Sequence, residues 1–282
     1  MEIRSLGNID FDTLFEAFES AFGDYAVKFE KEEVRAMLVR RGFNPNLSFG
    51  AFDGDRLVAF IFNGTGMFEG VPTAYDTGTG TVSGYRGRGL AKEIFSYALP
   101  YLREAGIRQY VLEVLQDNER AISVYRAAGL GVRRELKCFR QEKAKVAVSR
   151  FADESVTVKV IGTDEVLRHR DFCDFKPSWQ NTGESIVRAG NSVICIGAYS
   201  AGELAGYCVF DPATGDITQI AVGGQHRNRG IGSRLLAETV ARIRCEGIKV
   251  LNVCESDTSL AKFLISHNIP ESLCQYEMSM QI

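Results

Sequence analysis

The stretch Tyr85–Ala91, "YRGRGLA", follows directly on the glycine-rich run "TGTGTVSG" at 77–84. A second version, "HRNRGIG", stands at His226–Gly232. Each stretch combines basic residues with spaced glycines and precedes a segment whose apolar residues recur at helical spacing. A strand, a glycine turn and a helix start place several backbone N–H groups around one point, where the helix dipole also favours negative charge. Each half of the chain is therefore predicted to hold an anion-binding site.

Length and composition are those of a globular protein with two domains. The chain has 282 residues, of which 45% are apolar and 24% charged, and its formal net charge is −3. This length favours two domains, and the charge argues against nonspecific nucleic-acid binding. No apolar run is long enough to span a membrane, and the first ten residues lack a signal-peptide pattern. Seven cysteines without a close C-x-x-C pair favour reduced thiols and a cytoplasmic location.

Periodicity predicts the same order of elements twice. The first half is expected to hold strands at 2–6, 73–82, 109–115 and 130–139, a hairpin at 47–62, and helices at 11–22, 30–41, 89–105 and from 119. The second half is expected to hold strands at 156–162, 216–222, 249–254 and 274–280, a hairpin at 193–210, and helices at 163–174, 230–246 and 257–267. The segment 175–190 is predicted to be a loop, and packing is the expected role of its Trp179, the only tryptophan.

The duplication sets the predicted domain boundaries. Arg86 aligns with Arg227, an offset of 141 residues, and the elements on either side follow in the same order. The sequence therefore predicts two α/β domains, at 1–142 and 153–282, joined by the charged segment near 140–155.

The residues of the two loops can be compared with the known sequence patterns of anion-binding sites. A P-loop is excluded because no Gly-Lys-Ser/Thr follows either loop. A dinucleotide fingerprint fits poorly, because three residues, not two, separate the second and third glycines of "GTGTVSG". The pattern that both loops match is R-x-x-G-x-G/A, at Arg86, Gly89 and Ala91 and again at Arg227, Gly230 and Gly232.

With this pattern the chain resembles the GNAT superfamily of acyl-CoA-dependent N-acetyltransferases, in which the motif is the pyrophosphate-binding loop for acetyl-CoA. The first half adds "VLEVLQDNERAISVYRAAGL" at 111–130, with Asn118, Ala121, Tyr125 and Gly129 at the family's spacing. The resemblance covers nearly the whole chain. It implies two tandem GNAT-like domains, each a mixed, mostly antiparallel β-sheet flanked by helices, with acetyl-CoA as cosubstrate and no metal.

The resemblance also assigns cofactor contacts to residues of both halves. In the first half the cofactor-binding positions are Thr81, Val82, Arg86, Gly87, Arg88, Gly89, Leu90, Ala91 and Asn118. In the second half a candidate second cofactor site comprises Val222, Arg227, Asn228, Arg229, Gly230, Ile231 and Gly232.

Acetyl transfer to an amine needs a deprotonated amine, an N–H donor for the oxyanion and a proton for the departing thiolate. N–H groups near Thr81 and Val82 are expected to serve the oxyanion and the pantetheine, and Gly78 and Gly80 to clear room for the ligand. A phenol with a pKa of about 10 can protonate the thiolate of a thiol with a pKa of about 8.5. The resemblance makes Tyr125 this general acid.

The two halves differ where the chemistry is expected. The resemblance makes Glu113 the candidate general base, acting through water. Tyr125 aligns with Leu264 and Glu113 with Asn252, so the second half keeps the loop but lacks the acid and the base. We therefore expect an N-acetyltransferase whose chemistry lies in the first half. The alternatives are catalysis in the second half, as in mycothiol synthase-like tandem members, and a non-catalytic acyl-CoA sensor or scaffold.

The expected acceptor is a primary amine on a small molecule or a peptide, and no nucleic acid or membrane partner is expected. GNAT folds act on many different amines, so the fold does not select one. By analogy with the family, the segment 23–46 lines the acceptor side, but its mixed charge favours no particular acceptor. The sequence predicts no oligomeric state.

Overall fold

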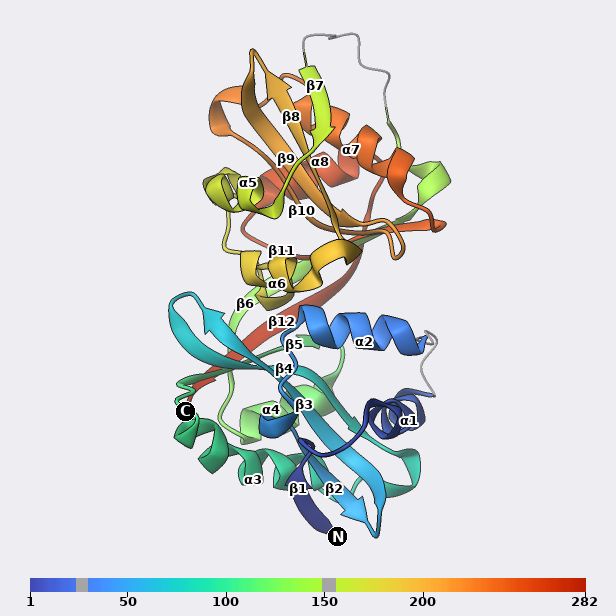
Figure 1. Cartoon of the computed structure of the whole chain (residues 1–282), viewed down its shortest axis with the longest axis vertical. Helices are drawn as coiled ribbons and strands as arrows, with labels where there is room; N and C mark the ends of the chain where they lie inside the picture. The colour runs from blue at the N-terminus through green and yellow to red at the C-terminus, as the bar shows by residue number, and fades with distance from the viewer. Residues whose placement is uncertain (24–29, 149–155) are drawn as a thin grey trace. The chain divides into compact units, whose positions relative to one another are not determined.

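The structure is a computed structural model that describes residues 1–23, 30–148 and 156–282, in two compact units (Figure 1). Unit 1 comprises Met1–Arg133 together with Glu277–Ile282, and unit 2 comprises Arg134–Tyr276. The segments 23–46 and 140–155, discussed above, each lie partly outside the described residues.

Unit 1 is a mixed sheet with helices packed against it. Its elements are β1 (Glu2–Ser5), α1 (Phe11–Phe22), α2 (Lys31–Arg40), β2 (Phe49–Asp53), β3 (Arg56–Phe68), β4 (Val71–Thr81), α3 (Leu90–Glu104), β5 (Gln109–Leu115) and α4 (Glu119–Ala127). Strands β1 to β4 pair antiparallel in chain order, and β4 pairs in parallel with β5. Helices α1 and α2 form one buried apolar cluster with Phe60 and Phe62 of β3.

Unit 2 repeats this order. Its elements are β7 (Val156–Val160), α5 (Thr163–Arg168), α6 (Gly183–Ala189), β8 (Ile194–Ser200), β9 (Glu203–Asp211), β10 (Asp216–Val222), α7 (Ile231–Arg242), β11 (Gly247–Cys254) and α8 (Thr258–Ser266). Strands β7 to β10 pair antiparallel, and β10 pairs in parallel with β11. Leu235 of α7 and Leu264 of α8 are buried in the main core cluster of this unit. The predicted mixed α/β fold with two repeats is confirmed.

Two strands cross the boundary between the units. Strand β6 (Gly131–Glu142) follows α4, but from Arg134 onward it belongs to unit 2, where it pairs antiparallel with β11. Strand β12 (Glu271–Gln281) ends in unit 1, where the N–H of Ile282 donates to the carbonyl of Arg108 at 3.0 Å. The compact units thus differ from the sequence halves, because each strand finds hydrogen-bond partners outside its own repeat. The predicted domain boundaries, 1–142 and 153–282, describe the duplication and remain a prediction.

The strand before each glycine loop is bulged and then loses its parallel partner. The register shifts in β4 and β10 make Thr77 and Thr218 the extra residues, at the same offset of 141 as the loops. Parallel pairing extends only to Tyr75 on β4 and to Asp216 on β10, although both strands continue beyond these residues. Because a bulge increases local twist, the neighbouring parallel strand separates at the bulge, several residues before each loop begins.

Three predicted elements differ from the structure. The predicted loop 175–190 contains α6, whose N-terminus is capped by Thr182: its hydroxyl oxygen accepts the N–H of Ser185 at 3.2 Å. The helices predicted at 163–174 and 230–246 end earlier, at Arg168 and Arg242. Trp179 has 1% of its surface exposed, as expected for a packing residue.

Candidate functional sites

Both glycine loops follow the same backbone path into a helix. Gly87 and Gly89 have φ angles of 79° and 78°, and Asn228 and Gly230 have 59° and 79°. Helices α3 and α7 begin directly after Gly89 and Gly230, so their first N–H groups have no acceptor within the helix. Asparagine is one of the few non-glycine residues that accept positive φ, which explains its place in the second loop. Such a turn directs successive N–H groups toward one point and can bind an anion.

The arginine of each motif donates hydrogen bonds to backbone carbonyls outside its loop and so fixes the loop, which we call its bracing role. In unit 1, Arg86 donates from Nε to the carbonyl of Thr81 at 3.2 Å and from its terminal nitrogen to the carbonyl of Ala21 at 2.9 Å. In unit 2, Arg227 repeats the first of these bonds with the carbonyl of Val222, at 3.0 Å. The guanidinium therefore holds the strand end and the loop in place, a role that the sequence analysis did not predict.

At the end of β4 the backbone donors are only partly as expected. The N–H of Val82 donates to the carbonyl of Val58 at 2.9 Å, so the prediction that it is available to a ligand was wrong. Because N–H groups alternate sides along a strand, that of Thr81 points away from β3. The room expected at Gly80 is also filled: a side-chain carbon there would lie 2.5 Å from the ring of Phe60.

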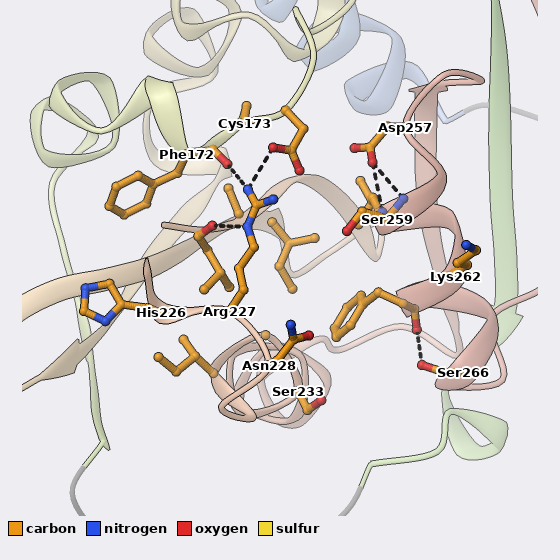
Figure 2. Close-up of a pocket in the computed structure, with 18 of the residues that line it drawn as sticks. Phe172, Cys173, His226, Arg227, Asn228, Ser233, Asp257, Ser259, Lys262 and Ser266 are labelled. Atoms are coloured by element: carbon orange, nitrogen blue, oxygen red, sulfur yellow. Dashed lines mark hydrogen bonds and ion pairs between the residues drawn. The ribbon is translucent and has the colours of Figure 1, made fainter. Parts of the chain in front are cut away.

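Unit 2 contains a cavity of about 550 Å³ at the start of α7 (Figure 2). Figure 2 shows Arg227 within it, where its guanidinium bonds to the carbonyl of Phe172 at 3.3 Å and to Asp174 at 2.9 Å. Gly232 forms part of the wall, and a side-chain carbon there would lie 3.1 Å from the ring of Phe263. The cavity has the size of a small-molecule site, and the residues of the candidate second cofactor site line it, with the exception of Arg229.

A smaller pocket beside this cavity is lined by residues of both β10 and β11. Cys173 lines both the main cavity and this smaller pocket. The hydroxyl of Tyr207 lies 3.2 Å from the Cys173 sulfur and donates to Gln219 at 3.0 Å. Burial raises the pKa of the Cys173 thiol, which keeps it protonated. Leu264, aligned with Tyr125, is fully buried in the core and provides no hydroxyl.

In unit 1, helix α4 places Tyr125 beside β4. The side chain of Asn118 caps this helix by accepting the N–H of Ala121 at 3.1 Å. Tyr125 is half-buried, and its hydroxyl donates to Asp76 Oδ2 at 3.5 Å. The predicted acid therefore lies next to the bulged part of β4. The predicted cofactor residue Asn118 has a structural task, which Asp257 performs for α8 in unit 2.

Asp76 is a candidate functional residue that the sequence analysis missed. Its Oδ1 accepts the N–H of Gly78 at 3.0 Å, and its Oδ2 accepts the hydroxyl of Thr79 at 2.6 Å. Exclusion of water by the surrounding protein raises the pKa of Asp76 to about 6, against the opposing effect of these bonds and of Tyr125. A carboxyl group that titrates near neutral pH is suited to proton transfer. The signal in the sequence is an acidic residue directly before the bulge.

Glu113, the predicted base, lies on β5 and pairs with a tyrosine of β4. The hydroxyl of Tyr75 donates to Glu113 Oε2 at 2.5 Å. Burial and the neighbouring charge of Glu113 raise the pKa of Tyr75 well above its usual value. The aligned Asn252 of unit 2 is fully buried and donates to the hydroxyl oxygen of Ser178 at 3.1 Å, so this position is structural there.

The family comparison agrees with this geometry. The Acetyltransferase (GNAT) family profile matches residues 11–130 and 164–264, one segment for each repeat. The matches cover more than half of the chain, and the chain therefore belongs to the GNAT acetyltransferase family.

Individual proteins are similar to this chain in part of the sequence or in fold. The chain is similar to "N-alpha-acetyltransferase 30" of Schizosaccharomyces pombe, with 31% identity over 86 residues; the match spans 30% of this chain and 57% of that protein. It is similar in fold to a tandem GNAT protein from the clavulanic acid biosynthesis pathway (TM-score 0.74, 16% identity, 99% of this chain and 98% of the other). A GCN5-related N-acetyltransferase from Sphaerobacter thermophilus is also similar (TM-score 0.71, 12% identity, 99% and 95% coverage).

The described residues were also searched for membrane-spanning helices, metal ligands and disulfides. None of the helices in residues 1–23, 30–148 and 156–282 is long and apolar enough to cross a membrane. Over the same ranges, no group of three or more His, Cys, Asp or Glu side chains is arranged to hold a metal ion. All seven cysteines fall in these ranges and are free thiols.

Proposed function

We propose that this protein transfers the acetyl group of acetyl-CoA to a primary amine and that the chemistry lies in unit 1. The observation that carries the proposal is the position of the Tyr125 hydroxyl, beside the part of β4 that no longer pairs with β5. The anion loop of the same unit starts where this strand ends. The free cysteines support a cytoplasmic location.

Each step of the reaction has a candidate group in unit 1. The backbone N–H groups of 87–91 would bind the pyrophosphate, and the N–H of Thr81 would donate to the carbonyl oxygen as its negative charge develops. Glu113 would take the proton of the attacking amine through water, and Tyr125 would give its proton to the sulfur as the carbon–sulfur bond breaks.

The test is release of CoA thiol from acetyl-CoA in the presence of a panel of amines. The panel includes short peptides with a free α-amino group, because a curated relative is an N-alpha-acetyltransferase by name. We expect turnover with at least one amine and none with the same compound blocked at nitrogen. Binding of acetyl-CoA without thiol release for any amine would favour the sensor or scaffold alternative.

A second function is proposed for unit 2, namely binding of acyl-CoA without transfer. The cavity at the start of α7 supports this proposal, and Leu264 and Asn252 offer neither a proton donor nor a base. Calorimetry should find two binding events for acetyl-CoA on the wild-type chain. A single event that disappears with the anion loop of unit 1 would contradict the second site.

A further inference from the structure

Asp76 and Tyr125 form a pair that the sheet and a helix bring together. Asp76 precedes the bulge residue of β4, and Tyr125 comes from the last turn of α4, 49 positions later in the chain. The backbone N–H of Gly78 and the hydroxyl of Thr79 fix the carboxyl group from its own strand. The carboxyl group is therefore held in one orientation, with Tyr125 as its neighbour from another element.

Unit 2 has lost both members of this pair. The residue aligned with Asp76 is Ile217, and the residue aligned with Tyr125 is Leu264. Both are fully buried and belong to the same apolar cluster. The bulge itself persists in unit 2, so the fold does not need a carboxylate before it. Two apolar residues can replace a buried polar pair with little loss of stability, which indicates that the pair in unit 1 is kept for something other than stability.

The surroundings of Asp76 are neutral on most sides. Tyr110 of β5, a buried phenol whose hydroxyl donates to Asn63 at 2.8 Å, interacts electrostatically with both Asp76 and Tyr125. Tyr75 is the neighbour along the strand. The positive charge of Arg41 favours the ionised form of Asp76, and Arg41 also donates to the carbonyl of Thr77 at 3.0 Å. Through Tyr75, which bonds to Glu113, a second carboxylate lies nearby.

We propose that Asp76 is the positioning residue of Tyr125: it holds the phenol hydroxyl and, in its acid form, returns to Tyr125 the proton that Tyr125 gives to the departing thiolate. The inference rests on the proposed function of unit 1. Asp76 does not touch the reacting atoms and acts through Tyr125 alone.

The proton transfers balance within one turnover. When the carbon–sulfur bond breaks, its electron pair goes to sulfur, which takes the phenolic proton of Tyr125. The oxygen of Tyr125 then takes the proton of the Asp76 carboxyl group. The attacking nitrogen loses one proton in forming the amide, so one proton is available through water to restore Asp76. No phenolate next to a carboxylate has to persist, which two neighbouring negative charges would disfavour.

The kinetic test uses Asp76→Asn, which keeps the shape and can still hydrogen-bond to Tyr125 but carries no exchangeable acid proton. Because the acid form is lost as pH rises through about 6, kcat of the wild type should fall across that range. We expect Asp76→Asn to lower kcat about tenfold and to remove this limb, with KM for acetyl-CoA unchanged. In a Tyr125→Phe background, Asp76→Asn should have no further effect.

Asp10→Asn is the matched control, because Asp10 also accepts one backbone N–H and one threonine hydroxyl, both from Thr13, but no tyrosine. It should leave kcat and the pH profile unchanged. Two results would overturn the proposal. One is additive effects of Asp76→Asn and Tyr125→Phe, and the other is a fall of kcat with rising pH, near pH 6, that persists in Asp76→Asn. If Asp76→Asn fails to fold, Asp76→Ile, the residue of unit 2, is the second variant and is judged by the same two criteria.

A stability measurement separates this inference from the proposed function, because it needs no turnover. The pKa of Asp76 in the folded protein, about 6, lies above the ordinary value of 3.8. The folded state therefore binds the extra proton between these values, and wild-type stability should fall as pH rises through this window relative to Asp76→Asn. Since the bond from Tyr125 lowers the pKa of Asp76, Tyr125→Phe should move the end of the fall to higher pH. An unmoved fall would show that the two groups are not coupled, whether or not any amine is acetylated.

Discussion

Units 1 and 2 share the anion loop and differ in the side chains beside it. In both, a bulged strand leads into a turn with positive φ angles, and an arginine binds the strand-end carbonyl five residues before it. Unit 1 then offers Tyr125 and Asp76, where unit 2 has Leu264 and Ile217. An anion site made of backbone N–H groups is therefore retained when side chains change, whereas proton transfer depends on a few residues that one copy lacks without any change of fold.

The largest effect is expected for Tyr125→Phe, which removes the phenol hydroxyl of α4. The aligned residue of α8, Leu264, has no hydroxyl. Turnover should fall about a hundredfold, the scale of general acid catalysis. Affinity for acetyl-CoA in calorimetry should stay the same, because the ring remains. Tyr97→Phe, at an exposed position of α3, is the control and should keep wild-type turnover. Unchanged turnover in Tyr125→Phe would place the acid elsewhere.

A smaller loss is expected for Arg86→Glu, which removes two bonds to carbonyl groups and places a negative charge behind the anion loop. KM for acetyl-CoA should rise about thirtyfold, or roughly 2 kcal/mol. Arg86→Lys separates the two causes, since it keeps the charge but cannot make both bonds. If Arg86→Lys binds acetyl-CoA like the wild type, charge and not bracing explains the effect.

For Glu113→Gln we expect about a tenfold fall in kcat and loss of the acidic limb of the rate–pH profile, because a base must be ionised to act. The amide keeps an oxygen to accept the hydroxyl of Tyr75, so the fold should be retained. Glu104→Gln, at an exposed position, serves as control. Persistence of the acidic limb with the same apparent pKa would assign the base to another group or to a water chain.

The smallest effect on turnover is expected for Arg227→Glu, the counterpart of Arg86→Glu. Turnover should stay within about threefold of the wild type, because the proposed chemistry lies in unit 1 and does not use the loop of unit 2. Calorimetry should nevertheless lose one of its two binding events, since Arg227 holds the loop that lines the cavity. Loss of turnover here, with Arg86→Glu unaffected, would move catalysis to unit 2.

The fold could be predicted from the sequence because its signals are local and occur twice. Most strands and helices with clear periodicity were confirmed to within a few residues, although the helix predicted at 163–174 ends at Arg168, and the offset of 141 residues identified the repeat. Helix α6 was missed because it has seven residues between Thr182 and Gly190, too few to show a period. Its stability comes from its cap and from burial of Ile186, which only the tertiary structure supplies.

The candidate site could be predicted only in part. Motif spacing identified Tyr125 and both loops, because those residues lie in contiguous segments. Asp76 was missed since its partner is distant in the chain and an aspartate among threonines and glycines is typical of a turn. The bracing role of Arg86 was missed for a similar reason: its acceptor Ala21 is 65 residues away.

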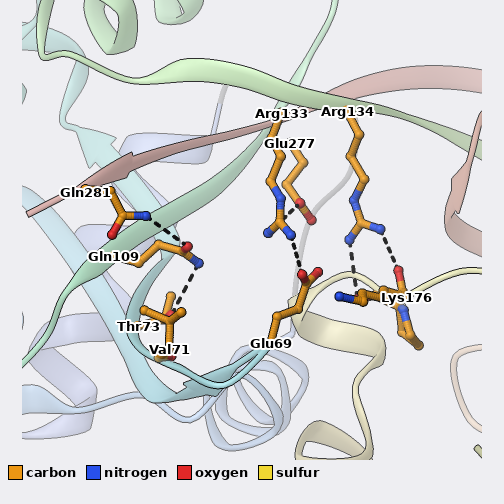
Figure 3. A network of polar contacts seen from close by, with 10 residues as sticks. Glu69, Val71, Thr73, Gln109, Arg133, Arg134, Lys176, Glu277 and Gln281 are labelled. Atoms are coloured by element: carbon orange, nitrogen blue, oxygen red, sulfur yellow. Dashed lines mark hydrogen bonds and ion pairs between the residues drawn. The ribbon is translucent and has the colours of Figure 1, made fainter.

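The sequence also has no local signal that shows which sheet β6 and β12 join. Periodicity predicts a strand but not the sheet that it joins. Figure 3 shows contacts that residues of these strands make in unit 1: Arg133 of β6 pairs with Glu69 at 2.6 Å and with the fully buried Glu277 of β12 at 3.5 Å. Nearby, the side chain of Gln281 donates to that of Gln109 at 3.5 Å.

This arrangement has a consequence for how the protein is made. Residues 277–282 belong to unit 1 and provide the neighbour of β5 there, yet they follow all of unit 2 along the chain. Every residue of unit 2, from 134 to 276, is synthesised before them. Domains of a nascent chain ordinarily fold in order from the N-terminus. Here unit 2 can fold before unit 1 is complete, because β5 of unit 1 lacks this neighbour until residues 277–282 have been synthesised.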